Sequence, residues 1–305
     1  MDLYHQIKLV KMFKTVKNII SIVLFGMASS ISAQQESLFT HYNEVIAVFN
    51  PAVSGINSTT EFTALRRAQW SGISMAPETF VFGVSIPTKG NVGLGINLVK
   101  DKTFVEQSTF IGIDYSYKLK IDEQTNLFLG LKGGAHAYEV NPGTLETFNP
   151  IFDSALESFS KVLPNLGVGL YLTHKNISIS MAAPRMFSTE RLQEEDGRAV
   201  FAKDRVHYYT SLDYRIDINP KTTLNAIGVS RFVQGAPMSF DFQGRLWYDS
   251  LVMLGGSYRT DKSLAGLLQL RVTENFSVGW AYESHSRSDL ANVGSSQEFV
   301  LMISL

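Results

Sequence analysis

The residues most able to do chemistry in this 305-residue chain include its histidines, and their spacing assembles no site. The six lie far apart, at His5, His41, His136, His174, His207 and His285. No pair has the i, i+4 spacing of a helical zinc site, and none belongs to an H-x-E motif. Because the chain has no cysteine, thiolate ligands and disulfides are excluded. We therefore expect no metal site and no cofactor.

Nucleophilic catalysis has equally little support. No serine stands in a G-x-S-x-G motif, and only His285 with its neighbouring serines suggests a Ser-His pair, which would suit a lipid hydrolase. Serine is abundant enough for chance to explain that pair. The pairs Gly93-x-Gly95 and Gly167-x-Gly169 lie within alternating segments rather than before a helix, so they are not nucleotide loops. We expect a protein that is not an enzyme and has no small-molecule substrate.

A third group of chemically capable residues is charged and falls on the polar side of alternating segments. The two signs are mixed, whereas a selectivity ring uses a single sign. We therefore expect ion pairs and hydrogen bonds across an enclosed interior, with stability as their main role. The members are Asp114, Lys118, Lys132, His136, Asp213, Arg215, Asp241, Arg245, Arg271 and Glu283.

The elements that would position these residues are strands with a period of two. In Ser108–Leu119, Ile111, Ile113 and Tyr115 alternate with Gly112, Asp114 and Ser116. Three other segments, Thr79–Ile86, Asn91–Val99 and Phe276–Glu283, behave in the same way. The last stretch, Gln297–Leu305, alternates to the final residue. Such a strand would be a hazardous free edge unless the first strand covers it, which predicts a closed barrel.

Two all-β folds fit this alternation, a secreted sandwich and a transmembrane barrel, and the connections favour the barrel. We count about 14 strands, and every second connection is short, as at Pro87–Gly90 and Ile121–Gln124. The intervening ones include the long Val140–Val162, Ala183–Asp204 and Ser284–Ser296 segments. Short periplasmic turns and long extracellular loops are typical of outer-membrane barrels. We predict a single antiparallel barrel of this kind over residues 59–305.

The amino-terminal region predicts export. Lysines precede the apolar run Ile19–Ala28, and small residues follow as far as Ala33. This run is too short to span a membrane, so we expect a signal peptide over residues 1–33, cleaved near Ala33, with Met12 a possible true start. Residues 34–58 are apolar but aperiodic and read as a lead-in or plug. The formal net charge of −1 gives no footprint for nucleic acid.

Several motifs in this order resemble a known family. Asn50-Pro51-Ala52-Val53-Ser54-Gly55 precedes a segment running from Arg67-Ala68-Gln69-Trp70 to Gly72, and then Ala76-Pro77-Glu78-Thr79. Near the end, Gly294-Ser295-Ser296-Gln297-Glu298-Phe299 resembles a terminal box in which His is usual where Gln297 stands. Together these resemble the PorP/SprF family over nearly the whole mature chain.

The resemblance implies an outer-membrane component of type IX secretion and gliding in Bacteroidetes-type bacteria. Such a protein is expected to contact outer-membrane lipid and to bind either a secreted adhesin's C-terminal domain or secretion subunits. The alternative is a passive or substrate-specific channel. Candidate partner-contact or plug residues are Asn50, Pro51, Gly55, Arg66, Arg67, Trp70 and Pro77, with the loops Val140–Val162 and Arg185–Arg205 as further surface candidates.

Overall fold

The computed structural model describes residues 39–70, 73–141, 158–187, 205–285 and 294–305. Residues 36–234 and 238–305 form one compact unit, which contains the whole barrel. The expected signal peptide, residues 1–33, lies outside the described residues. So do most of the long connections at 140–162, 185–205 and 284–296.

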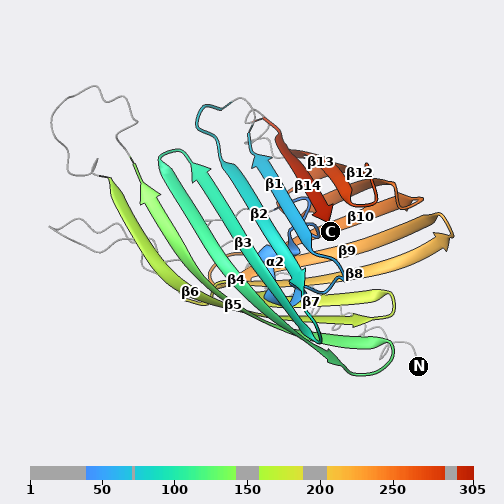
Figure 1. The fold of residues 1–305 in the computed structure, drawn as a ribbon. Coiled ribbons are helices and arrows are strands. Elements are labelled where there is room, and N and C mark those ends of the chain that lie inside the picture. Colours follow the sequence, from blue (N-terminus) through green and yellow to red (C-terminus); the bar gives the residue numbers. More distant parts are fainter. Residues whose placement is uncertain (1–38, 71–72, 142–157, 188–204, 286–293) are drawn as a thin grey trace, which may run out of the picture. The chain divides into compact units, whose positions relative to one another are not determined.

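Fourteen antiparallel strands close into one barrel, as predicted (Figure 1). Each strand pairs with its neighbours in sequence order. Their bounds are β1 Glu61–Ala68, β2 Glu78–Pro87, β3 Val92–Thr103, β4 Glu106–Lys120, β5 Thr125–Val140, β6 Phe159–His174, β7 Ile177–Ala183, β8 His207–Asn219, β9 Thr222–Val233, β10 Ser239–Tyr248, β11 Val252–Arg259, β12 Ser263–Arg271, β13 Phe276–His285 and β14 Ser296–Ser304.

The last strand closes on the first. β14 pairs antiparallel with β1 from Glu61↔Ser304 to Ala68↔Gln297. Backbone hydrogen bonds between Thr60 and Leu305 extend the seam by one residue. Closure pairs both edges of the sheet, so the backbone of each edge strand is satisfied without water.

Alternation along each strand separates an apolar outer wall from a polar inner wall. On β4, Ile111 and Ile113 point outward and are 51% and 63% exposed, while Asp114 points inward and is fully buried. The same division holds on β14, where Phe299 and Leu301 face outward and Glu298 inward. In an outer-membrane barrel, lipid covers the outer face.

The connections at one end of the barrel are all short, whereas the opposite end has the long connections together with two short ones, at residues 104–105 and 260–262. The end that holds Thr60, Leu305 and the short connections is called the turn end here, and the opposite end is called the loop end. At the turn end, Asp249 and Ser250 both have positive φ, and the amide of Leu251 donates to the carbonyl of Tyr248. These are features of a type I′ hairpin turn, whose twist suits the flanking strands.

A short segment, residues 39–58, lies inside the barrel and is called the lumen segment here. It contains a single helical turn, α2 (Ile46–Phe49), and a 3₁₀ turn, η1 (Pro51–Val53). The side chain of Asn50 caps η1 by accepting a hydrogen bond from the amide of Ala52. Among the described residues, no helix is long and apolar enough to cross a membrane.

Candidate functional site

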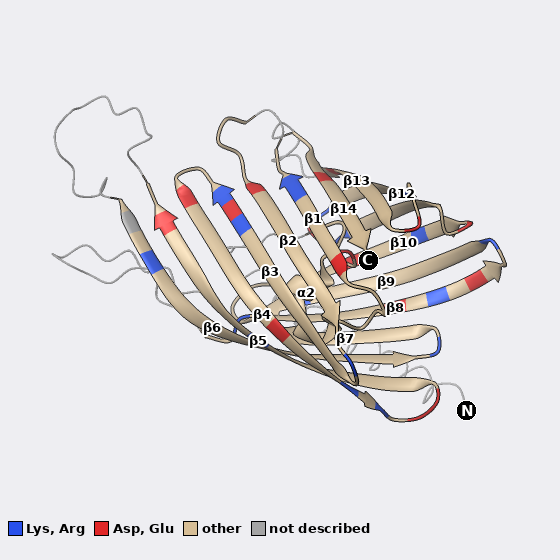
Figure 2. Cartoon of the chain, viewed as in Figure 1, with Lys and Arg blue, Asp and Glu red and all other residues tan. Residues whose placement is uncertain are grey.

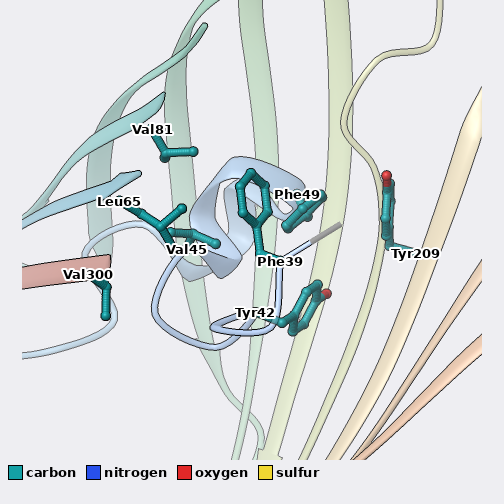
Figure 3. Packing of buried hydrophobic residues seen from close by; sticks show 8 residues of the cluster. All are labelled: Phe39, Tyr42, Val45, Phe49, Leu65, Val81, Tyr209 and Val300. Atoms are coloured by element: carbon teal, nitrogen blue, oxygen red, sulfur yellow. The ribbon is translucent and has the colours of Figure 1, made fainter. Parts of the chain in front are cut away.

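The barrel interior is filled by the lumen segment rather than by side chains of the wall alone (Figure 3). Its apolar residues Phe39, Tyr42, Val45 and Phe49 are buried. They pack against Leu65, Val81 and Val300 on the adjacent strands β1, β2 and β14, and against Tyr209 on β8. The ring of Phe49 lies 5.2 Å from that of Tyr42 and 4.7 Å from that of Tyr209, measured between centroids. This cluster fixes the segment against opposite sides of the wall.

A buried ion-pair network holds the first residues of the segment at the loop end. Arg67 on β1 pairs with Glu298 on β14 at 2.5 Å and with Glu283 on β13 at 3.0 Å. The carboxylate of Glu298 also accepts hydrogen bonds from the backbone amides of Thr40 and His41, at 2.7 and 2.9 Å. Thus the same carboxylate joins the barrel seam to the lumen segment.

The network continues along the wall toward β10. Arg259 on β11 lies 3.4 Å from Glu283 and 3.0 Å from Asp241 on β10, measured between nitrogen and oxygen. The Thr40 hydroxyl donates to Glu283 at 3.1 Å. Two arginines and three carboxylates thereby share one buried cluster, the arrangement in which buried charges are tolerated.

A second charged contact involves a glutamate of the segment itself. Arg245 on β10 donates to Glu44 at 2.7 Å, and Gln243 donates to the carbonyl oxygen of Thr40 at 2.7 Å. Burial alone would raise the pKa of the Glu44 carboxyl, but the charge and hydrogen bond of Arg245, together with smaller favourable contributions, outweigh it, so the pKa lies below its ordinary value of 4.5. Glu44 is therefore ionised at neutral pH and attracts Arg245.

The second half of the segment approaches the wall closely at glycines. A Cβ on Gly130 would lie 2.1 Å from the amide nitrogen of Ala52, and one on Gly169 would lie 1.9 Å from Asn50 Oδ1. Only glycine fits at these two positions of β5 and β6. Asn50 uses the proximity to donate to the hydroxyl of Ser180 on β7 at 2.7 Å and to the carbonyl of Leu170 at 2.8 Å.

The wall also presents a buried pair to the second half. Asp114 and Lys132 lie 3.4 Å apart on β4 and β5. Asp114 accepts a hydrogen bond from the Ser54 hydroxyl at 2.9 Å, while Lys132 donates to the carbonyl oxygens of Ala47 and Val48. Each member of this pair therefore also bonds to a neutral group of the segment.

Most of the charged residues expected in the interior do face it. Asp114, Lys132, His136, Arg245 and Glu283 are buried, and Asp213 accepts a hydrogen bond from Asn43 of the lumen segment at 3.0 Å. Asp241 is also inside, where it pairs with Arg259. Lys118 lies with its ammonium 5.9 Å from the centre of the Phe128 ring, and Arg215 and Arg271 are exposed near the turn end.

The seven candidate contact residues divide into three places. Asn50, Pro51 and Gly55 belong to the lumen segment, and Arg67 faces it from β1. Arg66 points outward and pairs with Glu78 on the outer wall. Trp70 and Pro77 lie in the connection between β1 and β2 at the loop end. Arg66 and Arg67 are therefore on opposite faces of the wall and do not form one site.

Sequence reasoning missed residues that carry much of the network. Thr40, His41 and Glu44 had no pattern that marked them, because their partners lie roughly two hundred or more positions away. Arg259 and Glu298 had a usable signal, since each is a charged residue on the inward side of an alternating strand. Within the described part of the chain, no three His, Asp or Glu side chains are grouped to hold a metal ion. The side chain of His285 lies outside the described residues.

Comparison with solved structures gives weak likenesses to barrels. A Pseudomonas aeruginosa FadL homologue is 11% identical, with 85% of this chain and 93% of that chain covered and a TM-score of 0.43. The P. putida toluene transporter TodX is 10% identical, with the same coverage and a TM-score of 0.45. The CymD monoaromatic hydrocarbon channel is 9% identical, with 92% and 95% covered and a TM-score of 0.47. Likenesses this low carry no argument about function, and no curated protein matches the chain.

The closed barrel, its apolar outer wall and its charge-paired interior define an outer-membrane β-barrel protein. The family model described as type IX secretion system membrane protein PorP/SprF matches residues 31–305. The chain therefore belongs to the PorP/SprF family, which confirms the resemblance seen in its motifs. Fold and family together support a place in the outer membrane and a part in type IX secretion. The outer-membrane barrel fold and the PorP/SprF family are both non-enzymatic kinds of protein.

Proposed function

We propose that this barrel is a non-enzymatic holding component of the type IX secretion and gliding apparatus. It binds either the C-terminal domain of a secreted adhesin or secretion subunits, for translocation and surface anchoring. The observation that carries the proposal is the filled interior. The lumen segment is hydrogen-bonded to strands on many sides of the barrel, including β2, β4–β8, β10, β13 and β14.

A channel would need a continuous water-filled path through the barrel. The contacts between the lumen segment and the wall argue against such a path. Its apolar cluster meets the wall at Leu65, Val81, Tyr209 and Val300. Its polar groups bond to inward side chains that include Asp114, Asp213 and Gln243. A cavity of about 190 Å³ remains beside the segment, lined partly by Asn43, Asp213 and Ser211. A cavity of this size holds a few water molecules.

The decisive experiment is recovery of the tagged full-length protein from its native envelope in mild detergent, with co-purifying proteins identified. We expect a large adhesin or secretion subunits. A barrel recovered alone, even after cross-linking, would contradict the holding role. Planar-bilayer recording of the purified protein then tests the channel alternative, for which steady conductance is expected.

Contact residues are proposed at the loop end. Trp70 and Pro77 lie there, in the connection between β1 and β2, and residues 140–162 and 185–205 are further candidates. Replacing Trp70 with alanine should reduce recovery of the partner, while Lys175→Ala at the turn end should not. Equal recovery from both variants would remove Trp70 from the contact surface.

Export is proposed to require cleavage near Ala33. Mass measurement of the mature protein should then give a chain that begins at Gln34. A mature chain that retains residues 1–33 would contradict this, because the lumen segment begins only a few residues later.

A further inference from the structure

The outer wall carries a group of basic side chains at the loop end of β1 and β3. Arg66, Lys100 and Lys102 all point outward and are exposed. Register places them together: Arg66 and Lys100 both pair with Phe80 on the intervening strand β2, and Lys102 lies two residues beyond Lys100. Figure 2 shows positive charge at the loop-end tips of these two strands. These three residues are called the basic shelf here.

The basic shelf borders the apolar band of the outer wall. Toward the turn end on the same faces stand Phe82, Ile96 and Leu301, which are 37%, 46% and 48% exposed. At the loop end of other strands, the outer wall carries aromatic side chains instead, including Tyr208, Phe232, Phe240, Tyr258 and Tyr282. Aromatic rings suit the interface between acyl chains and headgroups. The basic shelf therefore lies at the depth of the lipid headgroups. Unlike the aromatic side chains at the same depth, it carries positive charge.

A hollow adjoins the shelf at the barrel seam. It measures about 180 Å³ and is lined by Arg66, Ala68, Gln297 and Phe299. Glu78 accepts a hydrogen bond from Nε of Arg66. Within the described part of the chain, the two terminal nitrogens of that guanidinium have no protein acceptor. A guanidinium, an amide and a phenyl ring thus surround a space open to the membrane surface.

We propose that the basic shelf and its hollow bind the phosphate group of a lipid in the outer leaflet. Short turns of such barrels face the periplasm, so the loop end lies in the outer leaflet. The Arg66 guanidinium can donate two parallel hydrogen bonds to phosphate, and the lysines add point charges. Their methylene stems rest on the apolar wall while their ammonium groups reach the headgroup layer. Phe299 and the band below it accommodate the first part of the acyl chains.

The test uses the purified full-length barrel in detergent micelles and measures binding of lipid A that carries two phosphates. The variant is Arg66→Gln/Lys100→Gln/Lys102→Gln. Its matched control is Lys89→Gln/Lys175→Gln/Lys221→Gln, which removes three exposed charges from the turn end. Each basic residue near an anionic membrane surface contributes about fivefold in binding, so the shelf variant should lose well over tenfold and the control little. Lipid A stripped of its phosphates should bind wild type as weakly as it binds the shelf variant.

A second variant should change the affinity for the phosphorylated lipid in the opposite direction. Glu78→Gln removes the carboxylate that competes for Arg66, so affinity for the phosphorylated lipid should rise severalfold. Equal loss in the shelf variant and the turn-end control, or equal affinity for both forms of lipid A, would overturn the proposal. So would unchanged lipid binding by the shelf variant combined with loss of a co-purifying protein, which would assign the shelf to a protein partner instead.

Discussion

The two halves of the lumen segment are held in different ways. Residues 40–44 are fixed by charge, through Glu298, Glu283 and Arg245 of the wall. Residues 50–55 are fixed by fit, with their backbone against Gly130 and Gly169. The difference shows that one short segment can be anchored at one end by charged groups and at the other by close packing and hydrogen bonds from its neutral groups.

The comparison also separates what each half is sensitive to. Ion pairs in a buried cluster depend on every member being present, and on pH. Close backbone packing depends on the absence of side-chain atoms and is indifferent to pH and salt. Four substitutions test the two halves, from the largest expected effect to the smallest.

Loss of Arg67 should have the largest effect. Arg67→Met keeps the volume but leaves Glu298 and Glu283 buried with much of their positive partner removed. Removal of one partner from a buried ion pair costs about 3–5 kcal/mol. We expect a lower Tm and frequent channel openings in planar bilayers. Arg66→Met, at the neighbouring exposed position, is the control and should change neither.

A side chain at position 130 should displace residues 50–55 of the lumen segment from the wall. Gly130→Val places atoms where the backbone of Ala52 lies, and we expect a loss of about 3 kcal/mol in stability. Hydrogen exchange should then be faster in residues 50–55 than in residues 40–44. Gly133→Val on the same strand is the control, because a Cβ there meets nothing within 4 Å. Equal exchange in the two halves would mean that they do not dock separately.

Acid should loosen the charged half only. The Glu44 carboxyl has a pKa below its ordinary 4.5, so its ionised form stabilises the folded state above that pH, and this stability is lost as pH falls through the folded pKa. Channel openings should therefore increase below about pH 4.5. Glu44→Gln should weaken the docking of the lumen segment by about 1.5 kcal/mol. The variant should therefore show more channel openings than wild type at neutral pH and a smaller increase in acid. A variant with the pH response of wild type would exclude Glu44 from this role.

The smallest effect is expected at Ser54. Ser54→Ala removes one hydrogen bond to Asp114, which keeps its contacts with Asn97 and Lys132. A single such bond contributes about 1 kcal/mol. A small fall in Tm, without channel openings, is the expected result. Openings as frequent as in the Gly130 variant would show that the neutral half also depends on its polar bonds.

The barrel was predictable from the sequence because its determinants are local. Alternation in Ser108–Leu119 and Gln297–Leu305, together with connection length, predicted the strands, the closure and which face is apolar. The neutral half of the segment was also visible, through the motif around Asn50 and Gly55. The charged half was not, because the partners of Thr40 and Glu44 stand roughly two hundred or more positions away and only the closed barrel brings them together.

The position of Glu298 has a consequence for the register of the barrel seam. It lies on β14 at the barrel seam, and it accepts hydrogen bonds from the backbone amides of Thr40 and His41, which precede β1. A slip of the final strand by one residue would turn this carboxylate toward lipid and break every bond it makes with the interior. The contacts of Glu298 therefore tie the register of the barrel seam to the position of the lumen segment.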